Sequence, residues 1–388
     1  MKQFPSRASF RDTSHFILAV ASELAAPLLR LAARSVSRGG ASAPSEWRRA
    51  LIVGHGHIGD VLCQTVSLGA LASGLDKCQF DYLTTPLAAE VLSGNPAITR
   101  ILPWNTDARP DAVESEHFDM LRATQYDAII CTNVVRHQEA LRLALRLRIP
   151  NRVAFVHRGL SGLVTLPVRL EGPSNPAAQS RAMAGAITGV RDESELRPRI
   201  YLSADDVALA RAEWERLGLT PQETVVTCSV TTRQLIGRIP PEFFARVLRA
   251  LLHMAPATRI VLTGSRDDAP VLDELARTLG SGVAVSAGRL TIRGLAAFLA
   301  RGNLHFCMDS GPRHIANAAG TPVVFTRNLA VRAAEAGSYC ATEFDAMPHG
   351  DYLTPSEIRD VLAGIAPEAV ARCILDRLRP PESGVANG

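Results

Sequence analysis

The chain has 388 residues, of which 47% are hydrophobic and 21% are charged, with a formal net charge of +4. This length allows two domains with separate cores, and the composition is typical of a globular protein. The sequence contains no long basic run with interleaved aromatic residues, so nucleic acid is excluded as the expected partner.

Residues 1–47 differ in composition from the rest and form an N-terminal arm. The stretch from Phe16 to Leu31 is apolar, but Glu23, Pro27 and Arg30 interrupt it, so it is too broken for a membrane-spanning helix. Two interpretations stay open. The arm is either an amphipathic helix on an anionic membrane surface, or an extra helix packed on the body of the protein or a loose arm.

From residue 48 onward, strand-like and helix-like segments alternate. The first series has expected strands at 50–53, 79–83, 100–103 and 126–131, and expected helices at 60–75, 86–92 and 136–147. The second series has expected strands at 224–228, 259–263 and 305–308, and expected helices at 204–217, 242–253, 269–279 and 291–300. Such alternation predicts an α/β fold with two Rossmann-like doubly wound domains, at 48–200 and 201–388, which face a central cleft.

The first expected strand runs into GHGHIG, residues 54–59, which matches the G-x-G-x-x-G pattern of dinucleotide-binding loops. Asp81 lies at the right distance to hold a ribose, so an NAD(P)-dependent oxidoreductase is one hypothesis. However, Asp81 falls inside its strand, and Asp60 would oppose a pyrophosphate on the same helix. Asp60 fits a general base, or alternatively stabilises the helix dipole.

His55 and His57 flank the second glycine of this loop. Each could contact the acceptor or act as a base, and a structural role is the alternative that a lone histidine more often has. We expect His55, His57 and Gly59 to form the loop near the acceptor.

The second series ends in FCMDSGPRHIANAAGTPVV, residues 306–324, which predicts a strand, a turn and an alanine-rich helix. Ser310 suits the N-cap, Gly311 allows close approach of a ligand, and Pro312 suits the first helical turn. A helix N-terminus with free N–H groups is a site for an anion such as phosphate, and an ordinary capped turn is the alternative.

Five segments of the chain together resemble glycosyltransferase family 9, the ADP-heptose:lipopolysaccharide heptosyltransferases. They are LIVGHGHIGDVLCQTVSLGALASG, LSGNPAITRILPWN, VVTCSVTTRQLIGRIPPEFFARVL, VLTGSRDDAPVLDELA and the 306–324 stretch. The resemblance covers roughly residues 48 to 330. It implies a GT-B fold and an inverting, metal-independent transfer from a nucleotide-diphospho sugar.

The resemblance also implies roles for individual residues. Asp60 matches the family's base for the acceptor hydroxyl. The residues that match the donor-binding positions are Thr231, Thr232, Asp309, Ser310, Gly311 and His314. The family commonly carries a Lys shortly after the paired threonines. This chain has none there, so Arg233 or Arg238 would supply the charge, with a different geometry.

We therefore expect a cytoplasmic enzyme that transfers heptose or a related sugar from an ADP-sugar to a lipid-linked or polysaccharide acceptor. It would need no cofactor beyond that co-substrate and would contact the inner face of the membrane peripherally. No His, Cys or carboxylate cluster has metal-ligand spacing, and the seven cysteines form no CxxC pair. A non-catalytic family member that binds a sugar nucleotide remains an alternative.

Overall fold

The computed structural model describes residues 20–54, 57–104, 115–132, 137–156, 159–191, 193–232, 239–348 and 350–378. Contacts divide the chain into two compact units. The first unit comprises Met1–Gly56, Gln64–Gly172 and Gln179–Glu193, and the second comprises His57–Cys63, Pro173–Ala178 and Ser194–Gly388. Residues 57–63 thus make their contacts with the second unit, although the rest of their helix packs in the first.

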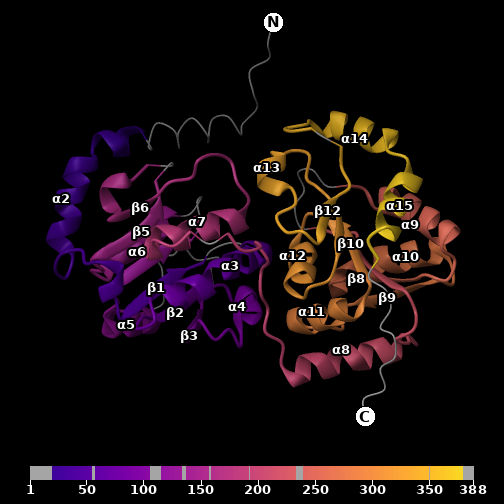
Figure 1. The fold of residues 1–388 in the computed structure, drawn as a ribbon, viewed down its shortest axis with the longest axis horizontal. Helices are drawn as coiled ribbons and strands as arrows, with labels where there is room; N and C mark the ends of the chain where they lie inside the picture. The colour runs from indigo at the N-terminus through magenta and orange to yellow at the C-terminus, as the bar shows by residue number, and fades with distance from the viewer. Residues whose placement is uncertain are drawn as a thin grey trace, which may run out of the picture. The chain divides into compact units, whose positions relative to one another are not determined.

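The first unit contains one sheet of six parallel strands in the order β3-β2-β1-β4-β5-β6 (Figure 1). Its strands are β1 Arg49–Val53, β2 Gln79–Thr84, β3 Arg100–Pro103, β4 Ala128–Cys131, β5 Asn151–Phe155 and β6 Leu166–Val168. The α-helices that accompany them are α2 Ala26–Val36, α3 Ile58–Gly74, α4 Pro86–Leu92, α5 Ser115–Thr124, α6 His137–Arg146 and α7 Pro176–Thr188. β1 and β4 are buried nearly throughout, as expected of parallel strands covered on both faces.

The second unit repeats this plan with the strand order β12-β11-β10-β7-β8-β9. Its strands are β7 Val225–Ser229, β8 Arg259–Gly264, β9 Val283–Ala287, β10 Leu304–Met308, β11 Val323–Thr326 and β12 Glu343–Asp345. Its α-helices are α8 Ala204–Arg216, α9 Pro241–Met254, α10 Ala269–Leu279, α11 Ile292–Arg301, α12 Gly311–Ala318, α13 Ala333–Ala336, α14 Pro355–Gly364 and α15 Pro367–Leu375. α9 and α15 lie side by side over a core that includes Phe244 and Phe306.

In both sheets the first strand of the unit lies beside the fourth, which is the strand order typical of Rossmann folds. The predicted pair of Rossmann-like domains is therefore confirmed. The order of the strands reverses between β1 and β4 in one sheet and between β7 and β10 in the other. Ligands of such sheets bind beyond the carboxyl ends of the strands at this reversal, so these two places are where a site is expected.

Candidate active site

The reversal in the second sheet brings together two of the segments singled out in the sequence. β7 and β10 are hydrogen-bonded neighbours, with Cys228 opposite Phe306 and Ser229 opposite Cys307. Thr231 and Thr232 follow the end of β7, and the Asp309 to Gly311 turn follows the end of β10. Segments about 80 residues apart in the sequence thus end at the same edge of one sheet. Residues that bind a single donor molecule would have to lie close together in this way.

The turn between β10 and α12 keeps backbone donors free. Ser310 occupies the N-cap position with extended backbone, but its hydroxyl donates to the Met308 carbonyl at 3.2 Å instead of capping the helix. Pro312 has no N–H, and the Arg313 N–H donates to the Ser310 carbonyl at 3.1 Å. Among the described residues, the N–H groups of Ser310 and Gly311 have no partner.

Gly311 faces open space. Apart from its chain neighbours and its own helix backbone, no atom of the described residues lies within 4 Å of a Cβ built at this glycine, so the Cβ side of Gly311 is open. A free N–H at a helix N-terminus next to empty space suits the oxygen of an anion. The expected side-chain cap by Ser310 is wrong, but its absence leaves the turn better suited to a ligand.

Arg313, which was not among the predicted site residues, anchors this turn through buried ion pairs and hydrogen bonds. The guanidinium is 1% exposed and forms ion pairs with Asp309 at 2.8 Å and with Glu343 at 2.7 Å. It also donates to the carbonyls of Ala336 and Gly337, at 2.7 Å each. The sequence does contain an indication of this ion pair. Arg313 follows Asp309 by four residues at the start of a helix, and residues with this spacing lie on the same helix face.

Two opposing effects act on the pKa of the Asp309 carboxyl. Burial raises its pKa above the usual value, while the charge and hydrogen bond of Arg313 lower it. Burial alone would lower the pKa of Arg313, but the carboxylates of Glu343 and Asp309 more than offset this. Arg313 is therefore charged, and it fixes the position of Asp309 at the end of β10.

The His314 ring is oriented by Tyr339, which is itself hydrogen-bonded to Asn317. The Tyr339 hydroxyl lies 2.7 Å from His314 Nδ1, and the two rings are stacked with centroids 5.6 Å apart. Asn317 Nδ2 donates to the same Tyr339 oxygen at 3.1 Å, which leaves the phenolic hydrogen for His314. We infer that Nδ1 accepts and that the ring hydrogen resides on Nε2.

The charge state of His314 follows from its surroundings. Burial, followed by the positive charge of Arg313, lowers the pKa of His314 to about 3. The ring is therefore neutral at physiological pH and offers Nε2–H as a hydrogen-bond donor rather than acting as a base. Cys63 Sγ, from α3, lies 3.5 Å from Nδ1.

The first turn of α3 lies against this group within the second unit. A Cβ on Gly59 would be 2.4 Å from His314 Cδ2, so only glycine allows this approach. Asp60, one residue later, is partly buried and accepts a hydrogen bond from the His57 N–H at 2.9 Å. Burial raises the pKa of Asp60; the His57 hydrogen bond and charge oppose this rise, and the charge of Asp309 adds to it. A carboxylate with a raised pKa is suited to taking a proton.

The reversal in the first sheet is arranged differently. A Cβ on Gly54 would overlap the ring of Tyr82, whose hydroxyl donates to Gln64 Oε1. Asp81, the candidate ribose ligand, is buried in β2 and ion-paired with Arg100, and it accepts the Tyr126 hydroxyl at 2.6 Å. Its carboxylate is thus occupied inside the unit, which disfavours the oxidoreductase hypothesis.

Four residues of interest in the sequence lie outside the described part of the chain: His55, Gly56, Arg233 and Arg238. His57 is described and exposed. Its role in the structure is the backbone hydrogen bond to Asp60.

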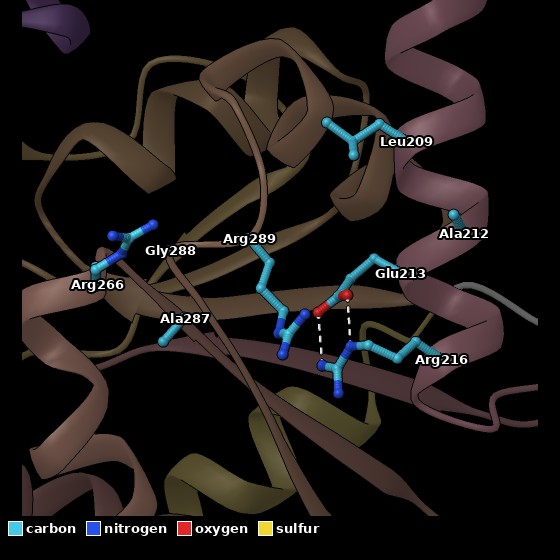
Figure 2. A pocket seen from close by; sticks show the side chains of 8 residues that line it. All are labelled: Leu209, Ala212, Glu213, Arg216, Arg266, Ala287, Gly288 and Arg289. Atoms are coloured by element: carbon cyan, nitrogen blue, oxygen red, sulfur yellow. Dashed lines mark hydrogen bonds and ion pairs between the residues drawn. The ribbon is translucent and has the colours of Figure 1, made fainter.

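A separate hollow of about 570 Å³ lies two strands away from the reversal, at the end of β9. Figure 2 shows the Glu213 carboxylate facing Arg216, with the Arg289 guanidinium nearby and Arg266 across the hollow. The charges of the lining arginines suit an anionic group. None of the predicted site residues lines this hollow, so the site predicted from the sequence gathers elsewhere.

Within the described residues, no three His, Cys, Asp or Glu side chains come together in a way that could hold a metal ion. No helix in that part of the chain is long and apolar enough to cross a membrane. All seven cysteines are free thiols.

Several solved structures share this fold. A glycosyltransferase family 9 protein from Veillonella parvula aligns with a TM-score of 0.71 at 19% identity, covering 87% of this chain and 98% of that one. The E. coli ADP-heptose LPS heptosyltransferase II aligns with a TM-score of 0.66 at 17% identity, covering 85% of this chain and 98% of its own. The E. coli heptosyltransferase WaaC with ADP aligns with a TM-score of 0.65 at 18% identity, covering 85% and 99%.

No curated protein matches the chain closely in sequence. The sequence model of glycosyltransferase family 9 (heptosyltransferase), however, matches residues 115–326, which is more than half of the chain. These findings agree with the two Rossmann-like sheets and with the motif at the end of β10. The chain belongs to glycosyltransferase family 9, and it is a glycosyltransferase with the GT-B fold.

Proposed function

We propose that the protein transfers heptose, or a related sugar, from an ADP-sugar to a lipopolysaccharide core or another glycan acceptor, with inversion at the anomeric carbon. The observation that carries this proposal is the β10–α12 turn, where the N–H groups of Ser310 and Gly311 have no partner among the described residues and the Cβ side of Gly311 is open. The structural neighbours support it, since one is named as an ADP-heptose LPS heptosyltransferase and another holds ADP.

In the proposed reaction, Asp60 takes the proton from the acceptor hydroxyl as that oxygen attacks the anomeric carbon. The bond from this carbon to the diphosphate breaks, and ADP leaves carrying the electron pair. A raised pKa makes Asp60 a stronger base than an ordinary aspartate. A single displacement of this kind inverts the anomeric configuration.

The leaving diphosphate gains negative charge, which the protein must stabilise. In our proposal the N–H groups of Ser310 and Gly311, the hydroxyls of Thr231 and Thr232, and the Nε2–H of His314 provide donors. Preorganised donors of this kind are worth most where charge develops in the transition state. Arg233 or Arg238 would add a positive charge. We propose that no metal is needed, so activity should survive EDTA.

We further propose that residues 201–388 hold the nucleotide and that residues 48–200 supply the acceptor side. The acceptor would be lipid-linked or a polysaccharide, and the protein would bind it at the inner face of the cytoplasmic membrane.

A thermal-shift panel tests the donor assignment. ADP-, GDP-, UDP- and CMP-sugars should be compared with NAD and NADP at the same concentration. Ligand-linked stabilisation is about 2.7 kcal/mol at a hundredfold excess over Kd. We expect ADP-sugars to raise the melting temperature most. Stabilisation by NAD or NADP alone would contradict the proposal.

A further inference from the structure

The N-terminal helical segment, residues 20–36, presents apolar side chains on two opposite faces. Residues 20–24 are helical, and the Ala25 and Leu29 N–H groups bond to the Ala21 and Ala25 carbonyls at 3.0 Å each, so the helix continues into α2. Ala25 has a ψ of 1° and Pro27 follows it, so the helical repeat is applied from Ala26 onward, and residues 20–24 are placed by their own contacts and exposure.

One face of the segment packs on the first unit. Ala26 and Ala33 are buried and Leu29 contacts the core, at positions i, i+7 and i+3 of the helix. A Cβ on Gly162 would lie 2.3 Å from the Ala26 carbonyl oxygen, so the two backbones meet closely. The packed-helix interpretation of the arm therefore holds for this face.

The segment is also tied down along its length by polar contacts. The Leu160 and Ser161 N–H groups donate to Ser22 Oγ and Glu23 Oε1 at 2.9 Å each, and Arg148 Nε donates to the Val36 carbonyl at 3.0 Å. These bonds hold the segment in one rotation about its axis, so its outer face is fixed. In Figure 1, α2 (indigo) runs along the margin of the first unit.

The outer face carries a ridge of leucines. Leu24, Leu28 and Leu31, spaced i, i+4 and i+7, are 81%, 72% and 68% exposed. They stand directly opposite the buried Ala26, Leu29 and Ala33 stripe. We call these three residues the leucine ridge. Exposing leucine side chains to water to this extent is unfavourable in free energy unless another surface covers them.

The charges beside the leucine ridge indicate what covers it. Arg30 and Arg34 are exposed and form no ion pair among the described residues. The one acidic residue of the segment, Glu23, is exposed, and its carboxylate accepts hydrogen bonds from the N–H and the hydroxyl of Ser161. Arg34, three residues after Leu31, lies directly beside the leucine ridge, and Arg30 lies on the same flank of the helix, between the ridge and the buried stripe. The leucine ridge is therefore flanked on one side by positive charge.

We propose that this face docks in the plane of an anionic lipid surface, with the leucine ridge among the acyl chains and Arg30 and Arg34 at the headgroups. Helices with an apolar ridge and arginines beside it bind such surfaces both by burying apolar side chains and by electrostatic attraction to anionic headgroups. Pairing with a second copy of the chain would instead bring the arginines of both copies together, and the one acid of the segment, Glu23, is already bound to Ser161. The proposal does not depend on the identity of the donor sugar.

The test uses the full chain and vesicles of phosphatidylcholine with or without phosphatidylglycerol. We expect the wild type to bind only the anionic vesicles. The triple variant Leu24→Ser, Leu28→Ser, Leu31→Ser should bind them about tenfold more weakly or worse, since its apolar contribution is lost. The variant Arg30→Gln, Arg34→Gln should lose part of the affinity and much of its salt dependence.

The matched control is Val190→Ser, Val207→Ser, Val271→Ser, which removes apolar side chains that are also exposed, at 60%, 47% and 39%, but that lie outside the segment. The control should bind as the wild type does. Unchanged thermal unfolding and ADP affinity in all variants would show that the fold and the donor site are intact. Equal binding by the wild type and the ridge variant, or a dimer that the ridge variant converts to a monomer, would overturn the proposal.

Discussion

Two glycine-containing turns follow strands at the order reversals of the two sheets, and they differ in what surrounds them. After β1, Gly54 packs against Tyr82, and the downstream Asp81 is bound by Arg100 and Tyr126. After β10, Gly311 faces open space, and two backbone N–H groups have no partner among the described residues. At Gly54 and Asp81, two positions that the dinucleotide pattern would use, the protein itself thus occupies the space and the carboxylate.

The difference shows what a glycine pattern can and cannot establish. Glycine permits close approach, but either a ligand or the protein itself can occupy the space that it leaves. At Gly54 and Gly59 the protein occupies it, through Tyr82 and His314. At Gly311 none of the described residues does. The predictions below test whether these two turns have the roles we assign, the first turn of α3 for the base and the β10–α12 turn for the donor.

The largest expected effect is at Asp60. Asp60→Asn should lower turnover by roughly 10² to 10⁴, as for a lost general base, and leave donor affinity unchanged. Because the pKa of Asp60 is raised and its ionised form is the active one, wild-type turnover should decline on acidification at a higher pH than an ordinary aspartate would dictate. Steady-state rates across pH, with ADP affinity measured in parallel, check both points.

The exposed Asp76→Asn serves as the matched control and should leave turnover as in the wild type. Near-normal turnover in Asp60→Asn would remove this residue from the mechanism, and would leave helix-dipole stabilisation as its role.

Arg313 should govern stability as well as the site. Arg313→Met keeps apolar volume against Phe325 but leaves the buried carboxylate of Glu343 without its ion-pair partner, which should lower the free energy of unfolding by about 3–5 kcal/mol. Arg277→Met removes an exposed ion pair with Glu274 and should change it by less than about 0.5 kcal/mol. Denaturant unfolding of both variants measures the difference, and equal effects would refute the anchoring role of Arg313.

A smaller effect is expected at Tyr339. Tyr339→Phe keeps the stacked ring but removes the hydroxyl that sets the hydrogen position on His314, so the donor should bind more weakly by about 1 kcal/mol. Nitrogen chemical shifts of His314 report its tautomer directly. We expect the Nε2–H form in the wild type and a mixture in the variant. An unchanged tautomer with unchanged affinity would show that Tyr339 does not orient the ring.

The strands and helices with strong periodicity were predictable, and they lie close to their expected bounds. β5 was missed because it begins with Asn151 and Arg152, polar residues that rarely signal a buried strand. Arg152 is accommodated there by the Ile149 carbonyl at 2.8 Å and Ser37 Oγ at 2.9 Å. These partners come from distant or irregular segments, and no local pattern could have predicted them.

The same limit applies to the site. The sequence led to Asp309, Ser310, Gly311 and His314 because they form one local motif. It did not lead to Tyr339 or Glu343, which follow 25 or more residues later and reach the motif only through the fold. Nor could the letters GHGHIG reveal that Tyr82 fills the space beside Gly54, because side-chain packing from β2 decides that.

The central claim is that the nucleotide diphosphate binds at the β10–α12 turn and not at the β1–α3 loop. Calorimetric titration of ADP into Gly311→Val and Gly56→Val tests it most directly. A side chain at Gly311 would occupy the open space beside the free N–H groups, so we predict a loss of about 2 kcal/mol in binding free energy, roughly 30-fold in Kd. Gly56→Val should change ADP affinity much less. A larger loss at Gly56 than at Gly311 would contradict the account.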